Sequence, residues 1–203
     1  MKRSSSIQIL FIMVLAILLA TGSAAVGQTA NTKVVKKATT HKQVKKTPPK
    51  KVMPIVPAKV ANNVKVVTIQ STRGNIVMEL YPALMPVTVA NFEKLVKSGF
   101  YNGLTFHRVE GWVIQGGDPA GNGTGGPGWA IKLETNPKLK NVRGALAMAR
   151  AADPNSAGSQ FYILKTDAPW LDGQYAVFGR VTKGMDVVDK VQIGDKMIKV
   201  TIQ

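Results

Sequence analysis

The chain has 203 residues, with 27 Lys or Arg against 11 Asp or Glu, so its formal net charge is +16. It contains no Cys and two His, which excludes disulfide bonds, zinc–thiolate and iron–sulfur sites, a thiol nucleophile and a three-histidine metal site within one chain. Hydrophobic residues make up 45% of the chain, and their uneven distribution divides it into three segments.

The first segment, residues 1–27, has the layout of a secretory signal peptide. Lys2 and Arg3 precede fourteen uncharged and nearly all apolar residues, 7–20, and small residues around Ala25 follow. An uncleaved membrane anchor is the alternative, but fourteen residues rise only about 21 Å as a helix against a hydrocarbon core of roughly 30 Å. We therefore expect an extracytoplasmic protein, periplasmic or secreted, that is membrane-anchored only if this segment is retained.

The second segment, residues 28–62, is predicted to be a disordered linker. Between residues 31 and 62 it carries nine Lys and four Pro, and no acidic, aromatic or Gly residue. It is either a solvated spacer or a polybasic tether for an anionic membrane or wall surface. The lack of aromatic residues argues against specific binding of nucleic acid, because single strands are bound largely by stacking.

The third segment, residues 63–203, is the predicted folded domain. It holds 12 of the 13 aromatic residues and 17 of the 19 Gly, and its 16 basic and 11 acidic residues leave a net charge of only +5. The high charge of the chain therefore belongs mostly to the first two segments. Nothing in the domain indicates an oligomer, so a monomer is expected.

Hydrophobic periodicity predicts a mainly β domain with two helices. Two strands, 64–71 and 76–80, are expected around a turn at 72–75, followed by a helix from Pro86 to a cap at Gly99. Further strands are predicted at 104–109, 113–116, 145–149, 161–164, 176–181 and 197–202, and a second helix at 185–191. Short strands separated by Gly- and Pro-containing turns favour an antiparallel sandwich or a closed barrel.

Several common catalytic motifs are absent. The domain has one histidine, His107, and no G-x-S-x-G elbow for a serine hydrolase. Gly121, Gly123 and Gly126 match the dinucleotide-binding pattern, but Pro127 follows where a helix should begin. A Gly-rich turn is the better interpretation of that segment.

Seven short strings occur in a characteristic order: FHRV at 106–109, QGGD at 115–118, GTGG at 123–126, AMAR at 147–150, GSQF at 158–161, WLDG at 170–173 and VFG at 177–179. Their order and spacing resemble the cyclophilin family of peptidyl-prolyl cis–trans isomerases, over residues 64–202. The resemblance implies a closed eight-stranded antiparallel barrel capped by two helices. It also implies catalysis without a cofactor or metal, on proline-containing segments of unfolded or exported proteins.

The resemblance assigns roles to thirteen residues. The catalytic residues are Arg108, Gln115 and Trp112. The residues expected to line the bound peptide are His107, Val113, Ala149, Arg150, Ala151, Phe161, Tyr162, Trp170, Leu171 and Tyr175. Trp170 resembles the form that binds cyclosporin, so a cyclosporin-type inhibitor is expected.

The sequence departs from the commonest family pattern at five of these positions, where Phe, Met, Asn, Phe and His are usual: Trp112, Val113, Arg150, Tyr162 and Tyr175. The segment between Arg108 and Gln115 is also one residue shorter, which makes the assignments of Trp112 and Val113 the least secure.

The residue types suit prolyl isomerisation. The barrier is about 18–20 kcal/mol because the amide nitrogen shares its lone pair with the carbonyl. In the twisted transition state this lone pair localises, and a fixed guanidinium such as Arg108 would bind it better than it binds the planar substrate. The alternative is a non-catalytic peptide-binding chaperone or scaffold, but the presence of both Arg108 and Gln115 favours the enzyme.

Overall fold

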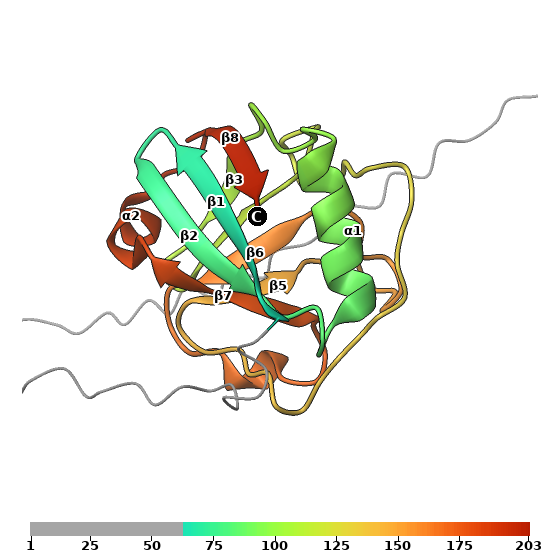
Figure 1. Cartoon of the computed structure of the whole chain (residues 1–203). Coiled ribbons are helices and arrows are strands. Elements are labelled where there is room, and N and C mark those ends of the chain that lie inside the picture. The colour runs from blue at the N-terminus through green and yellow to red at the C-terminus, as the bar shows by residue number, and fades with distance from the viewer. Residues whose placement is uncertain (1–62) are drawn as a thin grey trace, which may run out of the picture. The chain divides into compact units, whose positions relative to one another are not determined.

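The computed structural model describes residues 63–203, so the predicted signal peptide and linker lie outside the described residues. The described residues form eight strands and two α-helices, and Figure 1 shows how they are arranged. In chain order the elements are β1 (Lys65–Ser71), β2 (Gly74–Leu80), α1 (Pro86–Lys97), β3 (Phe106–Val109), β4 (Val113–Gly116), β5 (Ala145–Met148), β6 (Phe161–Leu164), the 3-10 helix η2 (Pro169–Leu171), β7 (Val177–Lys183), α2 (Met185–Lys190) and β8 (Met197–Ile202). The boundaries predicted from sequence differ from these by two residues at most.

The first hairpin forms because apolar residues alternate along both of its strands. Val67 and Ile69 in β1 and Ile76 and Met78 in β2 are fully buried, while most of the residues between them are partly or fully exposed. Successive side chains of a strand point to opposite faces, so this alternation places one face of the hairpin in the core. The turn is tighter than predicted, because β2 begins at Gly74.

The eight strands form one antiparallel sheet in the order β3-β4-β6-β5-β7-β2-β1-β8. The prediction of a mainly β, antiparallel fold with two helices is therefore confirmed. The prediction of a closed barrel is not: no regular ladder joins the end strands β3 and β8, and the sheet is a half-barrel. An isolated bridge pairs Thr105 with Lys196, and the Met197 amide donates to the Leu104 carbonyl at 2.8 Å.

Backbone hydrogen bonds still join the two edges of the sheet next to β3. The Gly103 amide donates to the Met197 carbonyl at 2.7 Å, the Phe106 amide donates to the Asp195 carbonyl at 2.9 Å, and the Gly194 amide donates to the Phe106 carbonyl at 3.0 Å. Residues 103–106 therefore lie alongside residues 194–197, although β3 itself begins only at Phe106, two residues later than predicted.

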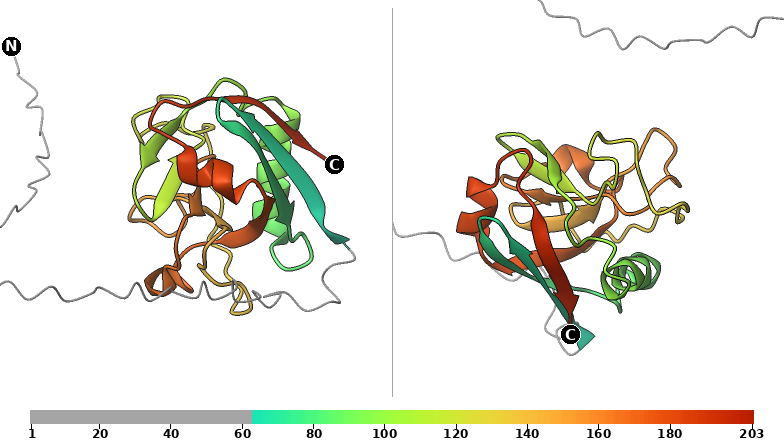
Figure 2. Two further views of the ribbon diagram at one scale, coloured as in Figure 1. Left: turned by 90° about the vertical axis from the view of Figure 1, so that its left-hand side faces the viewer. Right: turned by 90° about the horizontal axis from the view of Figure 1, so that it is seen from above.

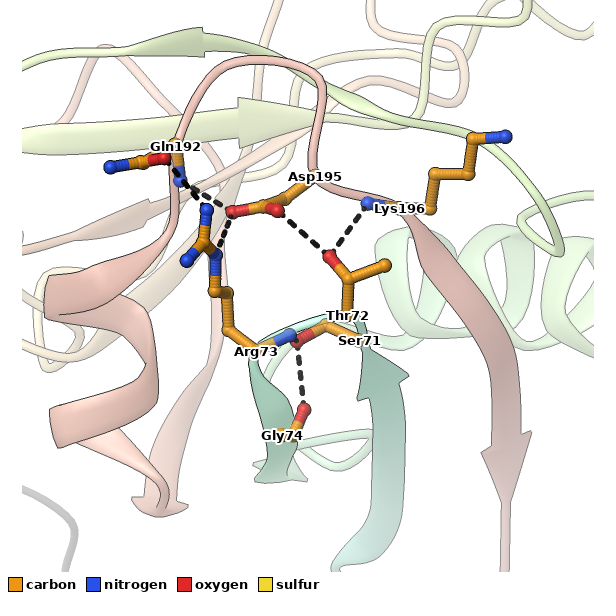
Figure 3. Close-up of polar contacts among 7 residues, drawn as sticks. All are labelled: Ser71, Thr72, Arg73, Gly74, Gln192, Asp195 and Lys196. Atoms are coloured by element: carbon orange, nitrogen blue, oxygen red, sulfur yellow. Dashed lines mark hydrogen bonds and ion pairs between the residues drawn. The ribbon is translucent and has the colours of Figure 1, made fainter.

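Side chains connect the elements near this opening. Figure 3 shows the turn after β1 joined to the loop between α2 and β8 through the carboxylate of Asp195. This carboxylate accepts hydrogen bonds from Thr72 Oγ1 at 2.9 Å, from Arg73 Nε at 2.7 Å and from the Gln192 amide at 2.7 Å. The network holds the start of β8 next to the end of β1.

Helix α1 packs beside the sheet, as the end-on view in Figure 2 shows. Its predicted apolar face is buried, and Phe92 contributes most to the core. The Phe92 ring lies 5.0, 5.1 and 5.6 Å from the rings of Tyr101, Phe178 and Phe161. Gly99 follows the helix with a φ of 73°, as expected of a C-terminal cap.

Within residues 63–203 no helix has both the length and the apolar character needed to cross a bilayer. The same residues hold no cluster of three or more His, Asp or Glu side chains arranged to bind a metal ion.

Candidate active site

One surface of the domain contains a cavity of about 430 Å³ that brings most of the predicted site residues together. Ten of the thirteen line it: His107, Arg108, Trp112, Val113, Gln115, Ala149, Arg150, Tyr162, Leu171 and Tyr175. Asn122 and Gly123, from the Gly-rich loop, also line the cavity and were not predicted.

The register of three neighbouring strands places the central residues. Arg108 in β3 pairs with Gln115 in β4, and Gln115 pairs in turn with Tyr162 in β6. Directly opposed residues in antiparallel strands project from the same face of a sheet. The three side chains therefore form a row, although their positions span more than fifty residues of sequence.

The Arg108 guanidinium is held from two directions. Its Nη1 donates to Gln115 Oε1 at 3.2 Å, and its Nε donates to Glu110 Oε1 at 2.6 Å. The guanidinium carbon also lies 5.3 Å from the centre of the Trp112 ring. The Nη2 group donates to no residue in the described part of the chain and is available to a ligand in the cavity.

A second glutamine extends this arrangement behind Gln115. The Gln115 amide donates to Gln160 Oε1 at 2.9 Å, and Gln160 Nε2 donates to the carbonyls of Gly123 and Gly125, each at 2.9 Å. An amide has both a donor and an acceptor, so the chain of bonds orients each member. Gln160 was not among the predicted site residues, although it belongs to the GSQF string.

The floor of the cavity is apolar, and a hydrogen bond beneath it fixes one of its side chains. Val113 and Tyr162 are buried, and the Tyr162 hydroxyl donates to Asn141 Oδ1 at 2.8 Å. Burial raises the pKa of Tyr162 well above its usual value, so the hydroxyl remains protonated at neutral pH. Beside it, the rings of Tyr162 and Tyr175 are 5.9 Å apart, and the Arg150 guanidinium lies 4.6 Å from the Tyr175 ring centre.

Three predicted residues do not line this cavity. Phe161 was expected in the floor, but its ring lies in the core, 5.5 Å from the Tyr101 ring, because adjacent residues of β6 point to opposite faces. Trp170 is 60% exposed and lies outside the cavity, with its ring 6.0 Å from that of Trp112. Ala151 lines a neighbouring cavity of about 570 Å³, which shares Gln115, Gly123, Ala149 and Arg150 with the first.

His107 faces the cavity without a hydrogen-bond partner for either ring nitrogen among residues 63–203. Burial lowers its pKa, the nearby Asp118 carboxylate opposes this shift, and the Arg108 charge adds to it. The ring is therefore neutral at pH 7, and it adds no positive charge beside Arg108.

Comparisons with known proteins agree with this site. The family model for cyclophilin-type peptidyl-prolyl cis-trans isomerases matches residues 65–203. Peptidyl-prolyl cis-trans isomerase B of Bacillus subtilis is 52% identical over 64% of this chain and 92% of its own length. A Helicobacter pylori peptidyl-prolyl cis-trans isomerase is 50% identical over 63% of this chain and 80% of its own.

Solved structures give the same result. A crystal structure of a cyclophilin-type isomerase from Cryptosporidium parvum superposes with a TM-score of 0.66 at 32% identity, covering 70% of this chain and 98% of that one. A second structure of that protein, determined in the presence of the dipeptide Ala-Pro, has a TM-score of 0.64 at 34% identity and covers 68% and 98%. The fold, the row of Arg108, Gln115 and Tyr162, and these similarities lead to one conclusion: the chain belongs to the cyclophilin family of peptidyl-prolyl cis–trans isomerases.

Proposed function

We propose that the cavity accelerates isomerisation of X–Pro bonds, with the proline ring held against Val113, Tyr162 and Leu171 and the Arg108 guanidinium directed at the prolyl nitrogen. The observation that carries this proposal is the fixed position of Arg108 at an apolar cavity, with Nη2 left for a ligand. The Cryptosporidium parvum structure determined with Ala-Pro supports a proline-containing ligand.

The chemistry follows from the change in the amide nitrogen. The nitrogen of a planar amide is a poor acceptor, and it becomes a good one when the bond twists and its lone pair localises. A donor held beside it therefore stabilises the transition state more than the substrate, which lowers the barrier. Arginine is suited to this role because it stays protonated and its donors form a rigid fork.

The magnitudes show that Arg108 cannot act alone. A thousandfold acceleration requires about 4 kcal/mol. One charge-assisted hydrogen bond contributes about 1.5–3 kcal/mol. The remainder must come from the apolar floor, which holds the ring still while the preceding carbonyl rotates, and from the hydrogen bonds that fix Arg108 in advance.

The direct test compares cis–trans exchange of a short X–Pro peptide, catalysed by the parent and by Arg108→Ala. We expect kcat/KM to fall by about one to two orders of magnitude, because the variant loses the donor that acts in the transition state. Arg180→Ala is the control, since Arg180 lies on β7 and does not line the 430 Å³ cavity. A parent that binds the peptide without accelerating exchange would instead support the non-catalytic chaperone or scaffold.

We also propose that the protein acts after export, on unfolded proteins whose X–Pro bonds exchange over tens to hundreds of seconds unaided. The signal-peptide pattern of residues 1–27 supports this location. Cell fractionation, together with the mass of the N-terminal peptide of the recovered protein, tests export and cleavage. Recovery of an intact chain from the cytoplasm would contradict the proposal.

Two partners are proposed besides substrate. The nine Lys between residues 31 and 62 support binding to an anionic membrane or wall surface, which deletion of this segment or added salt should abolish. The exposed Trp170 beside Trp112 supports binding of a cyclosporin-type inhibitor, which Trp170→Ala should weaken.

A further inference from the structure

Glu110 occupies the short connection between β3 and β4 and touches two residues of the cavity at once. Its Oε1 accepts from Arg108 Nε at 2.6 Å, and its Oε2 accepts from Trp112 Nε1 at 2.7 Å. Its own amide donates to the Val113 carbonyl at 2.8 Å, which anchors the residue at the end of the hairpin. Both carboxylate oxygens are therefore committed to groups that line the cavity.

These contacts have little effect on folding. The side chains of Arg108 and Glu110 are 42% and 43% exposed, and ion pairs this exposed contribute little to stability. Their effect is on orientation. Gln115 alone would hold the guanidinium at a single nitrogen, around which the plane could swing, whereas Glu110 adds a second fixed point at Nε.

The same carboxylate controls the Trp112 ring. An indole has a single N–H donor, and in Trp112 this donor is used by Glu110. The bond sets which face of the ring the guanidinium meets, at 5.3 Å. The hydrogen bond from Arg108 lowers the pKa of the Glu110 carboxyl, burial opposes this, and the bond from Trp112 adds to the lowering. Glu110 therefore accepts both bonds as a carboxylate at neutral pH.

We propose that Glu110 is a positioning residue, which sets the orientation of the Arg108 guanidinium and of the Trp112 ring together. This inference rests on the proposed function, because it assumes that Arg108 acts on the substrate. Without Glu110 the guanidinium would sample orientations that miss the prolyl nitrogen, and this lowers kcat because the affected interaction forms in the transition state.

The test compares Glu110→Ala and Glu110→Asp with the parent full-length chain in the X–Pro exchange assay. We expect Glu110→Ala to lower kcat about tenfold with a smaller change in KM, and Glu110→Asp, which keeps a carboxylate, to recover part of that loss. Glu79→Gln is the matched control: Glu79 also pairs with an arginine, Arg180 at 3.5 Å, but lies on β2 away from the cavity, so its kcat should equal that of the parent.

Two further measurements separate positioning from folding. The urea midpoint of Glu110→Ala should match that of the parent, because an exposed ion pair contributes little to stability. In nitrogen-15 spectra the indole N–H signal of Trp112 should shift in Glu110→Ala, while that of Trp129, which donates to Asn91 Oδ1, stays in place. A kcat loss explained by unfolded protein, or an unmoved Trp112 signal, would overturn the inference.

The Arg108→Ala background distinguishes this inference from the proposed function. If Arg108→Ala is as active as the parent, the proposed mechanism fails whatever Glu110 does. If Arg108→Ala is inactive but Glu110→Ala is as active as the parent, the inference alone fails. If Arg108→Ala and Glu110→Ala each lower kcat as expected, the double variant should have a kcat less than twofold below that of Arg108→Ala alone, since the two residues act as a unit.

Discussion

The Tyr162 hydroxyl donates a 2.8 Å hydrogen bond to Asn141 Oδ1 beneath the cavity floor. Asn141 is 1% exposed, and its backbone and side-chain N–H groups both donate to Asp172 Oδ1, at 2.8 and 3.1 Å. A tyrosine at this position, where the family pattern has Phe, is thus matched by a buried acceptor. The hydroxyl is therefore bonded beneath the cavity floor, and the Tyr162 ring lines the cavity.

Tyr162→Phe should therefore affect stability more than activity. Loss of the hydroxyl leaves the buried Asn141 oxygen without this donor, which we expect to cost about 1–2 kcal/mol of unfolding free energy. Urea unfolding measures this cost. Tyr175→Phe is the control, since its hydroxyl donates to no residue of the described chain, and its midpoint should stay unchanged. Equal midpoints for both variants would show that Asn141 is satisfied by other means.

Gln160→Ala should reduce turnover without contact between Gln160 and Arg108. Gln160 accepts a hydrogen bond from Gln115, and Gln115 in turn accepts one from Arg108 Nη1. Removal of the Gln160 side chain therefore loosens the guanidinium indirectly, through Gln115. We expect kcat to fall several-fold, by less than in Arg108→Ala. The exposed Gln70 on β1 provides the control Gln70→Ala. If Gln160→Ala turns over at the parent rate, Gln115 orients Arg108 without this support.

The Asp195 network should make stability depend on pH at the acidic end. Burial acts to raise the pKa of Asp195, but hydrogen bonds from Arg73, the Gln192 amide and Thr72 outweigh it and lower the pKa below the ordinary 3.8. The stability contributed by a carboxyl with a lowered pKa is complete above its unfolded value and is lost as the pH falls through its folded value.

Asp195→Asn tests this contribution. The variant should unfold about 1 kcal/mol more easily than the parent at pH 7, and the difference should shrink as the pH falls from 3.8 through the lowered pKa of Asp195 in the folded parent. Asp186→Asn on α2 is the control, since the side chain of Asp186 is 75% exposed and its one ion pair, with Lys190, is long at 3.8 Å. This substitution should therefore change the stability little at any pH. A difference that stays constant down to pH 2 would contradict the linkage.

Gly117→Ala should be severely destabilising, because Gly117 combines a positive φ with a close backbone contact. Its φ is 85°, and an added Cβ would lie 2.4 Å from the Ser159 carbonyl oxygen. Gly103→Ala isolates the first effect, since Gly103 has a φ of 82° with nothing within 4 Å of the added carbon. We expect about 1 kcal/mol for Gly103→Ala and more than about 3 kcal/mol for Gly117→Ala in urea unfolding. Similar losses of unfolding free energy in the two variants would mean that the Ser159 backbone moves to accommodate the added carbon.

Local patterns predicted the strands and helices well. Alternating apolar residues located β1 and β2, and β4, β6 and β8 begin and end at the predicted residues. The strands β1 and β2 were predictable because apolar residues alternate along them, and β6 was predictable as a short apolar run that is buried throughout. The missing ladder between β3 and β8 was not predictable in this way, because it depends on where the two edge strands of the sheet meet after the sheet has curved.

Most residues of the site were predicted, but the hydrogen bonds that join them were not. Motif resemblance identified Arg108 and Gln115, and strand register then placed them side by side. Glu110 and Gln160 carried no separate signal, because a glutamate in a turn and a glutamine before a strand are ordinary surface residues until their partners are known. Phe161 was misplaced because a string of letters does not indicate which of two adjacent residues faces the cavity.

Composition and local periodicity predicted the division into a leader pattern, a Lys-rich segment and a folded domain, since such patterns can be recognised without knowing which residues are in contact. The sequence also determined the family, through strings whose order is preserved along the chain. The contacts that hold Arg108, the hydrogen-bond partner of the Tyr162 hydroxyl, and the place where the sheet stays open became known only from the tertiary structure. Each of these depends on contacts between residues brought together by strand pairing and loop packing, and such contacts exist only once the chain has folded.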